Sequence, residues 1–299
     1  MVAALAVAAV LALVVTRGAA PGPAVFGVAG HPTGLVVTGD AVLVALPGSG
    51  TVTALDPVSG TQLGAPLRTG GAPTRLAVGA AGLWVGDTAR GAVIPVQRSP
   101  SRVYGAIEVG SDVTDLELAA GALWVASAAE GVVRIVEPGG RPVLSAHVGA
   151  DPVDVAAGGR WVVVAGAGSG SLTRFDARTR QRVGGPIRLG VVPVAAAVTG
   201  DSAWVADSAG GTVRRVDLLT GRPQGAPIAV GRRPVAVAAD GEDVFVLSRG
   251  DRTLVHVDGA AGEVLSRRAV GPDPAALALA GDHVWVADSG DDTLMRFAR

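Results

Sequence analysis

VVPVAAAVTGDSAWVADSAGGTVRRVDLLTGRPQGAPIAVG, residues Val191 to Gly231, contains four short apolar stretches separated by turns. The first stretch follows Pro193, the second contains Trp204 and the third ends at Asp217. Gly200-Asp201 joins the first two stretches, and such a dipeptide suits the positive backbone angles of a tight hairpin. This segment therefore predicts one four-stranded antiparallel meander.

The same pattern recurs about every forty residues along the chain. Its equivalent anchor positions are Pro32, Pro73, Val113, Pro152, Pro193, Pro234 and Pro274. Eleven residues after the anchors stand Leu43, Trp84, Trp124, Val163, Trp204, Phe245 and Trp285. In the fourth repeat Trp161 precedes Val163 by two residues, so on a strand both point to the same face. A regular repeat of four strands is typical of a β-propeller rather than a helical solenoid. We therefore predict an all-β, seven-bladed β-propeller with four-stranded antiparallel blades.

The last repeat, from Pro274 to Arg299, contains only three strands before the sequence ends. Upstream of the first anchor, Ala24 to Val28 resembles the final strand of a blade. We expect this N-terminal strand to complete the last blade, because pairing the two ends removes exposed sheet edges. The propeller would then occupy residues 24–299.

An unbroken apolar run from Val2 to Val15 precedes the repeats. We assign residues 1–17 to a membrane anchor or signal segment and residues 18–23 to a linker. The run is short for a membrane span of roughly 20 residues, and no basic residue precedes it. We expect an anchor whose cytoplasmic flank is missing; a cleaved signal and a buried structural helix remain the alternatives. The expected location is extracytoplasmic, with the protein membrane-anchored or secreted.

Composition excludes several kinds of chemistry. All 25 basic residues are arginine, and the chain has no lysine, asparagine or cysteine. The absence of cysteine excludes disulfides and thiolate sites. A formal charge of −1 with interspersed signs indicates neither a nucleic-acid footprint nor a polybasic membrane patch. The bias toward Ala, Val, Gly and Arg is typical of a GC-rich genome such as an actinobacterium's.

Motifs such as PxxLAV, LWVAD, GTVRRVD and VGxxP, seen for example around Pro73, Trp204, Gly211 and Val230, resemble the YVTN and NHL propeller families, including YncE-like proteins. The resemblance covers residues 24–299 and implies the fold, but propellers include both binding modules and enzymes. The chain also resembles the NHL-like extracytoplasmic sensor halves of actinobacterial Ser/Thr kinases, which follow a single membrane span. It contains no kinase motif of its own.

Strand alternation predicts that the fourth-to-first and second-to-third loops of every blade share one rim of the ring. Arg75, Asp115 and Asp154 each lie two residues past an anchor in three neighbouring blades, and Glu117 follows one strand step after Asp115. One interpretation is a site for a polar or cationic ligand, or a metal held by the carboxylates. The other is an ion pair beside solvated carboxylates.

Two further series share a repeat position. Fourteen residues past their anchors, short side chains are expected to cap their own turns: Asp87, Ser127, Asp207, Ser248 and Asp288. Twenty-two residues past, we expect solubilising surface cations: Arg174, Arg215, His256 and Arg296. The four histidines, His31, His147, His256 and His283, occupy different repeat positions, which argues against a histidine metal or catalytic centre.

We therefore predict a noncatalytic binding or sensing propeller without cofactor, metal or nucleic acid. Its loop rim would bind a protein, peptide or cell-envelope component, and the ring would be monomeric. The alternative is a metal-dependent propeller enzyme. Gluconolactonase-like hydrolases use asparagine ligands that this chain lacks, whereas streptogramin lyase resembles it in its repeat but needs a convergent histidine and glutamate. His31 is the nearest histidine to the inner position of Glu117.

Overall fold

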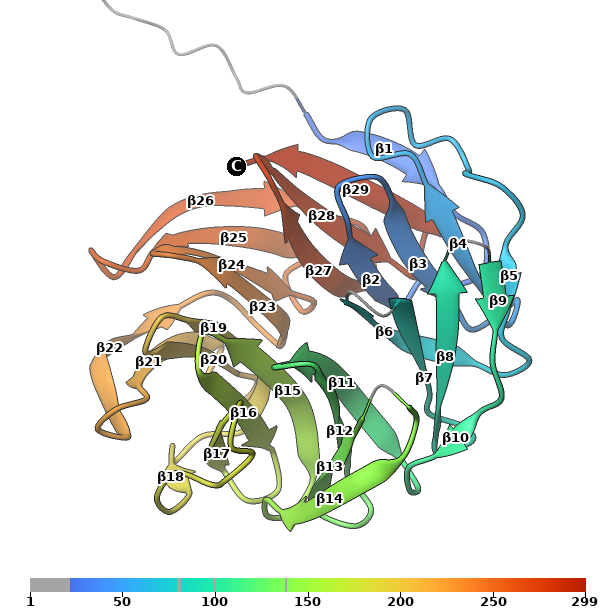
Figure 1. Cartoon of the computed structure of the whole chain (residues 1–299). Coiled ribbons are helices and arrows are strands. Elements are labelled where there is room, and N and C mark those ends of the chain that lie inside the picture. Colours follow the sequence, from blue (N-terminus) through green and yellow to red (C-terminus); the bar gives the residue numbers. More distant parts are fainter. Residues whose placement is uncertain (1–21, 80–81, 99–100, 138) are drawn as a thin grey trace, which may run out of the picture.

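The computed structural model describes residues 22–79, 82–98, 101–137 and 139–299. These residues form seven antiparallel sheets arranged as the blades of a ring, and no helix occurs among them (Figure 1). In each blade the first strand of the repeat lies innermost and the last lies outermost. The predicted seven-bladed, all-β propeller is confirmed.

Each of the first six blades comprises the consecutive strands of one repeat. Blade 1 contains β2 (Gly34–Val37), β3 (Val42–Leu46), β4 (Thr51–Leu55) and β5 (Leu67–Arg68). Blade 2 contains β6 (Pro73–Gly79), β7 (Gly82–Asp87) and β8 (Ala92–Arg98), and its outer strand is divided into β9 (Ser101–Val103) and β10 (Ile107–Glu108). Blade 3 contains β11 (Val113–Ala119), β12 (Ala122–Ser127), β13 (Val132–Val136) and β14 (Pro142–His147). Blade 4 contains β15 (Pro152–Gly158), β16 (Trp161–Gly166), β17 (Ser171–Asp176) and β18 (Ile187–Arg188).

The remaining blades follow the same order. Blade 5 contains β19 (Pro193–Thr199), β20 (Ser202–Asp207), β21 (Thr212–Asp217) and β22 (Arg222–Ala229). Blade 6 contains β23 (Pro234–Asp240), β24 (Asp243–Ser248), β25 (Thr253–Asp258) and β26 (Glu263–Ala269). Blade 7 contains β27 (Pro274–Ala280), β28 (His283–Asp288), β29 (Thr293–Ala298) and, as its outer strand, β1 (Ala24–Gly27).

The hydrophobic core consists of separate clusters between neighbouring blades. Trp204, for example, packs against Val244, Val246, Val255 and Val257 of blade 6. The large residues at the same repeat position each lie in a different cluster: Leu43, Trp84, Trp124, Val163, Trp204, Phe245 and Trp285. The repeated bulky residue is therefore the side chain that joins each blade to the next.

Blade 4 replaces the usual tryptophan with a pair. Trp161 and Val163 lie in the same inter-blade cluster, as the strand period predicts. The Trp161 indole Nε1 donates a hydrogen bond of 2.7 Å to Asp201 Oδ1 in the adjacent blade. Moving the tryptophan by two residues thus keeps the interface filled and gives its buried N–H an acceptor.

The N-terminal strand closes the ring as predicted. β1 pairs antiparallel with β29, with Ala24 opposite Arg296 and Gly27 opposite Thr293. Phe26 stacks on Trp285 with ring centroids 5.6 Å apart. The seventh blade therefore combines strands from both ends of the chain, and β1 covers an edge of β29 that would otherwise be open.

The predicted anchor or signal segment lies outside the described residues. Among the residues that are described, no helix is long and apolar enough to cross a membrane. The expectations for residues 1–17 and for most of the linker thus remain predictions.

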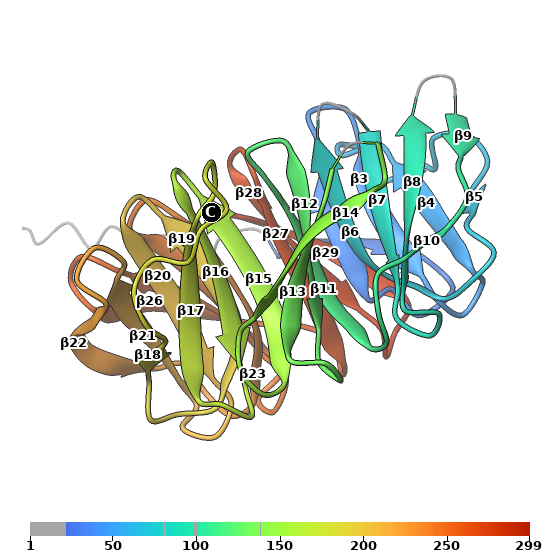
Figure 2. The ribbon, with the colours of Figure 1, turned by 60° about the horizontal axis from the view of Figure 1, so that its bottom comes forward.

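The strands run between two rims of the ring (Figure 2). On the first, which we call the loop rim, second-to-third turns bond to fourth-to-first loops, as in Ala128 N to Asp112 O and Ala167 N to Asp151 O. On the opposite rim, third-to-fourth turns bond to first-to-second turns, as in Leu218 N to Asp201 O. The predicted sharing of one rim by the two loop groups is confirmed.

The prediction of four solubilising surface cations is wrong. Each side chain lies in the ladder directly opposite the bulky inter-blade residue of its own blade. Arg215 accordingly lies 5.5 Å from the Trp204 ring, and His256 stacks 4.2 Å from Phe245. Arg174 is only 9 % exposed and donates to the carbonyl oxygens of Val183 and Leu218. These cations pack over the inter-blade core instead of being simply solvated.

Candidate functional site

A cavity of about 350 Å³ lies at the centre of the ring, lined by the innermost strands of all seven blades. In six of these strands, which start at the loop rim, the lining begins one or two residues after the first residue. Its volume falls within the range of about 300–1,000 Å³ typical of small-molecule pockets. This cavity is the candidate functional site, which we call the channel cavity.

The wall of the channel cavity is chemically uneven. Blades 2, 3 and 4 contribute all four side chains that the sequence predicted, namely Arg75, Asp115, Glu117 and Asp154. Blades 5, 6 and 7 contribute mainly alanine, valine and leucine. The cavity therefore has a charged wall opposite an apolar wall.

A β-bulge positions three of the charged side chains. The ladder register shifts between Pro73 and Arg75, and the same shift occurs before Asp115 and Asp154. A bulge re-aims the side chain that follows it. Arg75 Nε consequently lies 3.4 Å from Asp115 Oδ1, so the ion pair of the sequence prediction forms.

Both aspartates also bond to the backbone of the next blade. Asp115 Oδ2 accepts the Val155 N–H at 2.9 Å, and Asp154 Oδ2 accepts the Ala196 N–H at 2.8 Å. Val155 and Ala196 lie on the innermost strands, whose channel-side N–H groups have no further strand to pair with. Asp115 and Asp154 thus connect neighbouring blades as well as lining the cavity.

Burial shifts the acid–base properties of the cluster. Desolvation raises the pKa of Asp115, although the Arg75 guanidinium opposes the shift. It raises the pKa of Asp154 well above its ordinary value, and the neighbouring Asp115 charge adds to the effect. The titrations of the two carboxyl groups are therefore linked, because each group shifts the pKa of the other.

Glu117 differs from the two aspartates. Desolvation, with a smaller contribution from the Asp115 charge, raises the pKa of Glu117 to about 8. Within the described part of the chain, its carboxyl group forms no hydrogen bond or ion pair with another side chain or the backbone. It is therefore the group of the cluster that remains available to a ligand at the centre of the cavity.

The two sequence interpretations each describe part of the site. The ion pair is present, but the carboxylates are not simply solvated, since the Asp115 side chain is only 15 % exposed. For the metal interpretation, no group of three His, Cys, Asp or Glu side chains within the described ranges is placed to hold a metal ion.

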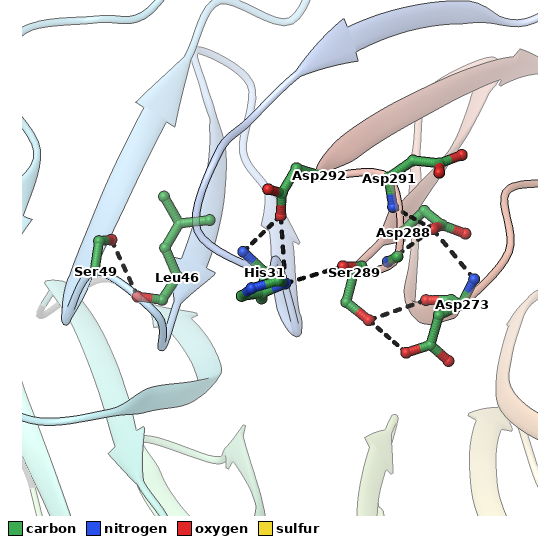
Figure 3. A network of polar contacts seen from close by, with 9 residues as sticks. His31, Leu46, Ser49, Asp273, Asp288, Ser289, Asp291 and Asp292 are labelled. Carbon is green, nitrogen blue, oxygen red and sulfur yellow. Dashed lines mark hydrogen bonds and ion pairs between the residues drawn. The ribbon is translucent and has the colours of Figure 1, made fainter.

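His31 lies on the loop rim at the junction of blades 7 and 1 and does not line the channel cavity (Figure 3). Its backbone N–H donates to Asp292 Oδ1 at 2.8 Å, and its Nδ1 is 3.1 Å from the Ser289 carbonyl oxygen. These contacts fasten the loop before blade 1 to a turn of blade 7. The histidine nearest to Glu117 by repeat position is therefore part of the ring closure.

The turn interpretation of the short polar series is confirmed for the aspartates, whereas the two serines bond to the preceding loop and not to their own turns. Asp207 Oδ1 accepts the N–H of Ala209 in its own turn and also that of Val192 in the preceding loop. Ser248 makes the complementary bond, because its Oγ donates to the Val230 carbonyl oxygen. Both residue types tie the second-to-third turn to the fourth-to-first loop.

Sequence reasoning missed the apolar wall. The strands of blades 5, 6 and 7 place small residues where blades 2 to 4 have charged ones: Ala195, Ala236 and Ala276 occupy the position of Arg75, Asp115 and Asp154. The signal was present in the repeat alignment as a run of alanines at the inner position.

No protein-family model and no curated protein matches the sequence. Solved structures match its fold. Virginiamycin B lyase from Staphylococcus aureus superposes with a TM-score of 0.79 at 13 % identity, covering 93 % of this chain and 99 % of that one. A catalytically inactive histidine-to-alanine variant of that lyase with quinupristin gives 0.80 at 14 % identity, with the same coverage. Hydrazine synthase of Kuenenia stuttgartiensis gives 0.76 at 15 % identity, covering 90 % and 96 %. At such identities the likeness shows the shared β-propeller fold and nothing of the activity.

Proposed function

We propose that this protein is a noncatalytic binding or sensing propeller of the YVTN/NHL type, located outside the cytoplasm of a bacterium. The observation that carries the proposal is the uneven channel cavity, with a charged wall on blades 2 to 4 and an apolar wall on blades 5 to 7. Two chemically distinct walls suit a ligand that has a polar and an apolar part.

The ligand is a protein, peptide or cell-envelope component that inserts a basic group into the cavity. Such a group would face Glu117, while its apolar part contacts the alanine wall around Ala236. A cation beside Glu117 favours the ionised carboxylate, so binding would release a proton. Affinity should therefore increase as the pH rises toward about 8.

A capture experiment with matched variants tests this proposal. The immobilised protein is incubated with envelope extract, and the bound material is compared between the wild type, Glu117→Gln and Glu263→Gln. Glu263 is an exposed carboxylate on β26, so its variant controls for loss of one charge. A component retained by the wild type and by Glu263→Gln, but not by Glu117→Gln, supports a channel ligand. Identical capture by all three proteins contradicts it.

The alternative is a metal-dependent propeller enzyme of the lactonase or streptogramin lyase type. It is favoured by one observation: a carboxyl group with a pKa of about 8 in a cavity can exchange protons near neutral pH. Elemental analysis of the purified protein and incubation with quinupristin, with and without chelator, distinguish the two. Bound divalent metal together with chelator-sensitive turnover would establish the enzyme, whereas a binding module gives neither.

We further propose that residues 1–17 anchor the propeller to the membrane through the linker 18–23, and that the ring is monomeric. The anchor is supported by the apolar run Val2 to Val15, which ends two residues before the linker. Flotation of the full chain with lipid vesicles tests the anchor, and light scattering in detergent tests the monomer.

A further inference from the structure

A second cavity, of about 450 Å³, lies between blades 3 and 4 and shares no lining residue with the channel cavity. It is lined by the end of β14, the loop that follows it, the start of β17 and the segment that leads into β18. Both β14 and β18 are the outermost strands of their blades (Figure 1). This cavity, which we call the outer cavity, therefore lies at the outer edge of the ring.

The lining of the outer cavity is cationic. Arg182 and Arg188 contribute guanidinium groups, and His147 contributes an imidazole. Among the described residues that line it there is no aspartate or glutamate. Neither arginine forms an ion pair within the described part of the chain, whereas Arg180 pairs with Glu137 at 3.2 Å. The positive charge of the outer cavity is thus not neutralised by a carboxylate on its wall.

The sequence around the outer cavity explains this charge. Residues 177–200 contain four arginines and no acidic residue. The whole chain, in contrast, balances 25 basic residues against 26 acidic ones. A local excess of arginine on a nearly neutral protein favours the binding of anions.

Both guanidinium groups have hydrogen-bond donors to spare. Arg182 donates to the His147 carbonyl oxygen across the blade boundary, which leaves its other N–H groups free. Arg188 lies opposite Ser171 in the ladder, and its side chain forms no hydrogen bond with the described residues. The hydroxyl groups of Ser169 and Ser171 bond to each other at 2.8 Å. The guanidinium groups are therefore the main donors that a ligand could use.

Blade 1 has the same local architecture without the second cation. Arg68 pairs with the first residue of the third strand, as Arg188 does in blade 4. Gln62 forms the isolated bridge to the third strand that Arg182 forms in blade 4. Two arginines at these positions are thus a feature of blade 4 and not a requirement of the repeat.

We propose that the outer cavity binds a phosphate monoester, with Arg182 and Arg188 contacting the phosphate oxygens. Such a group carries a charge of about −1.5 to −2 at neutral pH, which two guanidinium groups match. The planar guanidinium donors also fit phosphate oxygens in a bidentate manner. Val148 and Pro186 line the same cavity and offer apolar surface to the organic part of the ester. This site is additional to the channel cavity and independent of the ligand proposed there.

Isothermal titration calorimetry of the full chain in detergent, at low ionic strength, tests this site. Glycerol phosphate is the monoester probe, glycerol is the uncharged control, and inorganic phosphate tests the need for an organic part. The variants Arg188→Gln and Arg182→Gln each remove one cation from the outer cavity. Arg68→Gln is the matched control, because Arg68 is exposed and occupies the place of Arg188 in blade 1.

We expect the wild type to bind glycerol phosphate but not glycerol, with an affinity that falls as salt is added. Each substitution in blade 4 should weaken binding about tenfold or more, because it removes charge-assisted hydrogen bonds. Arg68→Gln should leave the affinity unchanged. Glu117→Gln should also leave it unchanged, so this experiment and the capture experiment test the two sites separately.

Arg188→Gln decides the outcome, because Arg188 is exposed and its loss should not alter the melting temperature. Absence of binding by the wild type, or equal affinity of the wild type and Arg188→Gln, would overturn the proposal. Equal weakening by Arg68→Gln and Arg188→Gln would also overturn it, because attraction would then be spread over the surface. Inorganic phosphate binding as tightly as glycerol phosphate would overturn the assignment of a monoester.

Discussion

At the residue scale, Glu117 links the electrostatics of the channel cavity to stability. Burial raises its pKa from an ordinary value of 4.5 to about 8, so between these pH values the folded protein binds a proton that the unfolded chain lacks. The free energy of unfolding must therefore fall as the pH rises through this window. Above a pH of about 8, the ionised, partly buried carboxylate lowers the free energy of unfolding by an amount that no longer changes with pH.

Glu117→Gln removes this cost because glutamine stays neutral. Chemical denaturation at several pH values between 4.5 and 9 should show that the free energy of unfolding of the variant increases relative to that of the wild type as the pH rises. The difference should reach on the order of 1–3 kcal/mol at the alkaline end. Asp115 and Asp154 are present in both proteins, and their charges interact with that of Glu117, so the difference reports the Glu117 charge together with its coupling to these two carboxyl groups. A difference that does not change with pH would show that the carboxyl group titrates near its ordinary value.

Arg174 gives a second prediction at this scale. Its buried guanidinium satisfies the carbonyl oxygens of Val183 and Leu218, the latter in the next blade. Arg174→Met preserves much of the apolar stem but leaves these acceptors unpaired, which should lower the free energy of unfolding by about 2 kcal/mol. Arg178→Met, at an exposed position on the adjacent turn, is the control and should change it little. Equal effects of the two substitutions in urea titrations would restore the surface interpretation of Arg174.

At the scale of elements, the closing strand depends on Phe26. Its ring stacks on Trp285, the bulky residue that joins blade 7 to blade 1. Phe26→Ala should therefore lower the free energy of unfolding by about 2–4 kcal/mol and reduce the melting temperature measured by circular dichroism. Val25→Ala, one residue away and pointing to solvent, should have little effect. Matching losses from both variants would mean that β1 contributes only backbone pairing.

The elements also show what the sequence could predict. Blade number, strand order, ring closure and the two rims followed from the forty-residue period, because each repeat must bury its bulky residue against the next blade. The charged cluster was located for the same reason, since Arg75, Asp115 and Asp154 share one repeat position. The forty-residue period could not predict how side chains at different repeat positions pack against one another. The packing of Arg174 against the turn of another blade depends on how two sheets twist together, and the Glu117 pKa depends on burial inside a cavity formed by seven strands.

At the scale of the whole molecule, the propeller differs from an open repeat array by one interface. In an open array each unit contacts only its sequence neighbours, and stability is approximately the sum of those contacts. Here the cluster containing Trp285, Val42 and Val44 joins the last blade to the first, and β1 covers it from the outside. Chain ends that are far apart in sequence thus hold the ring together, so constraining them should stabilise the whole molecule.

A disulfide across the closure tests this argument. Val25 and Met295 lie directly opposite each other in the β1–β29 ladder, where Cα atoms are about 4.5–5.5 Å apart, a distance that a disulfide can bridge. Val25→Cys with Met295→Cys should, when oxidised, raise the free energy of unfolding by on the order of 3–5 kcal/mol over the reduced form, because it closes nearly the entire chain into one loop. Gln97→Cys with Arg102→Cys, a directly opposed pair joining β8 to β9, closes only a short hairpin and should stabilise much less. If the two disulfides give the same increase in denaturation midpoint, the ring does not depend on its ends, and the stability of the propeller resides in its individual blades.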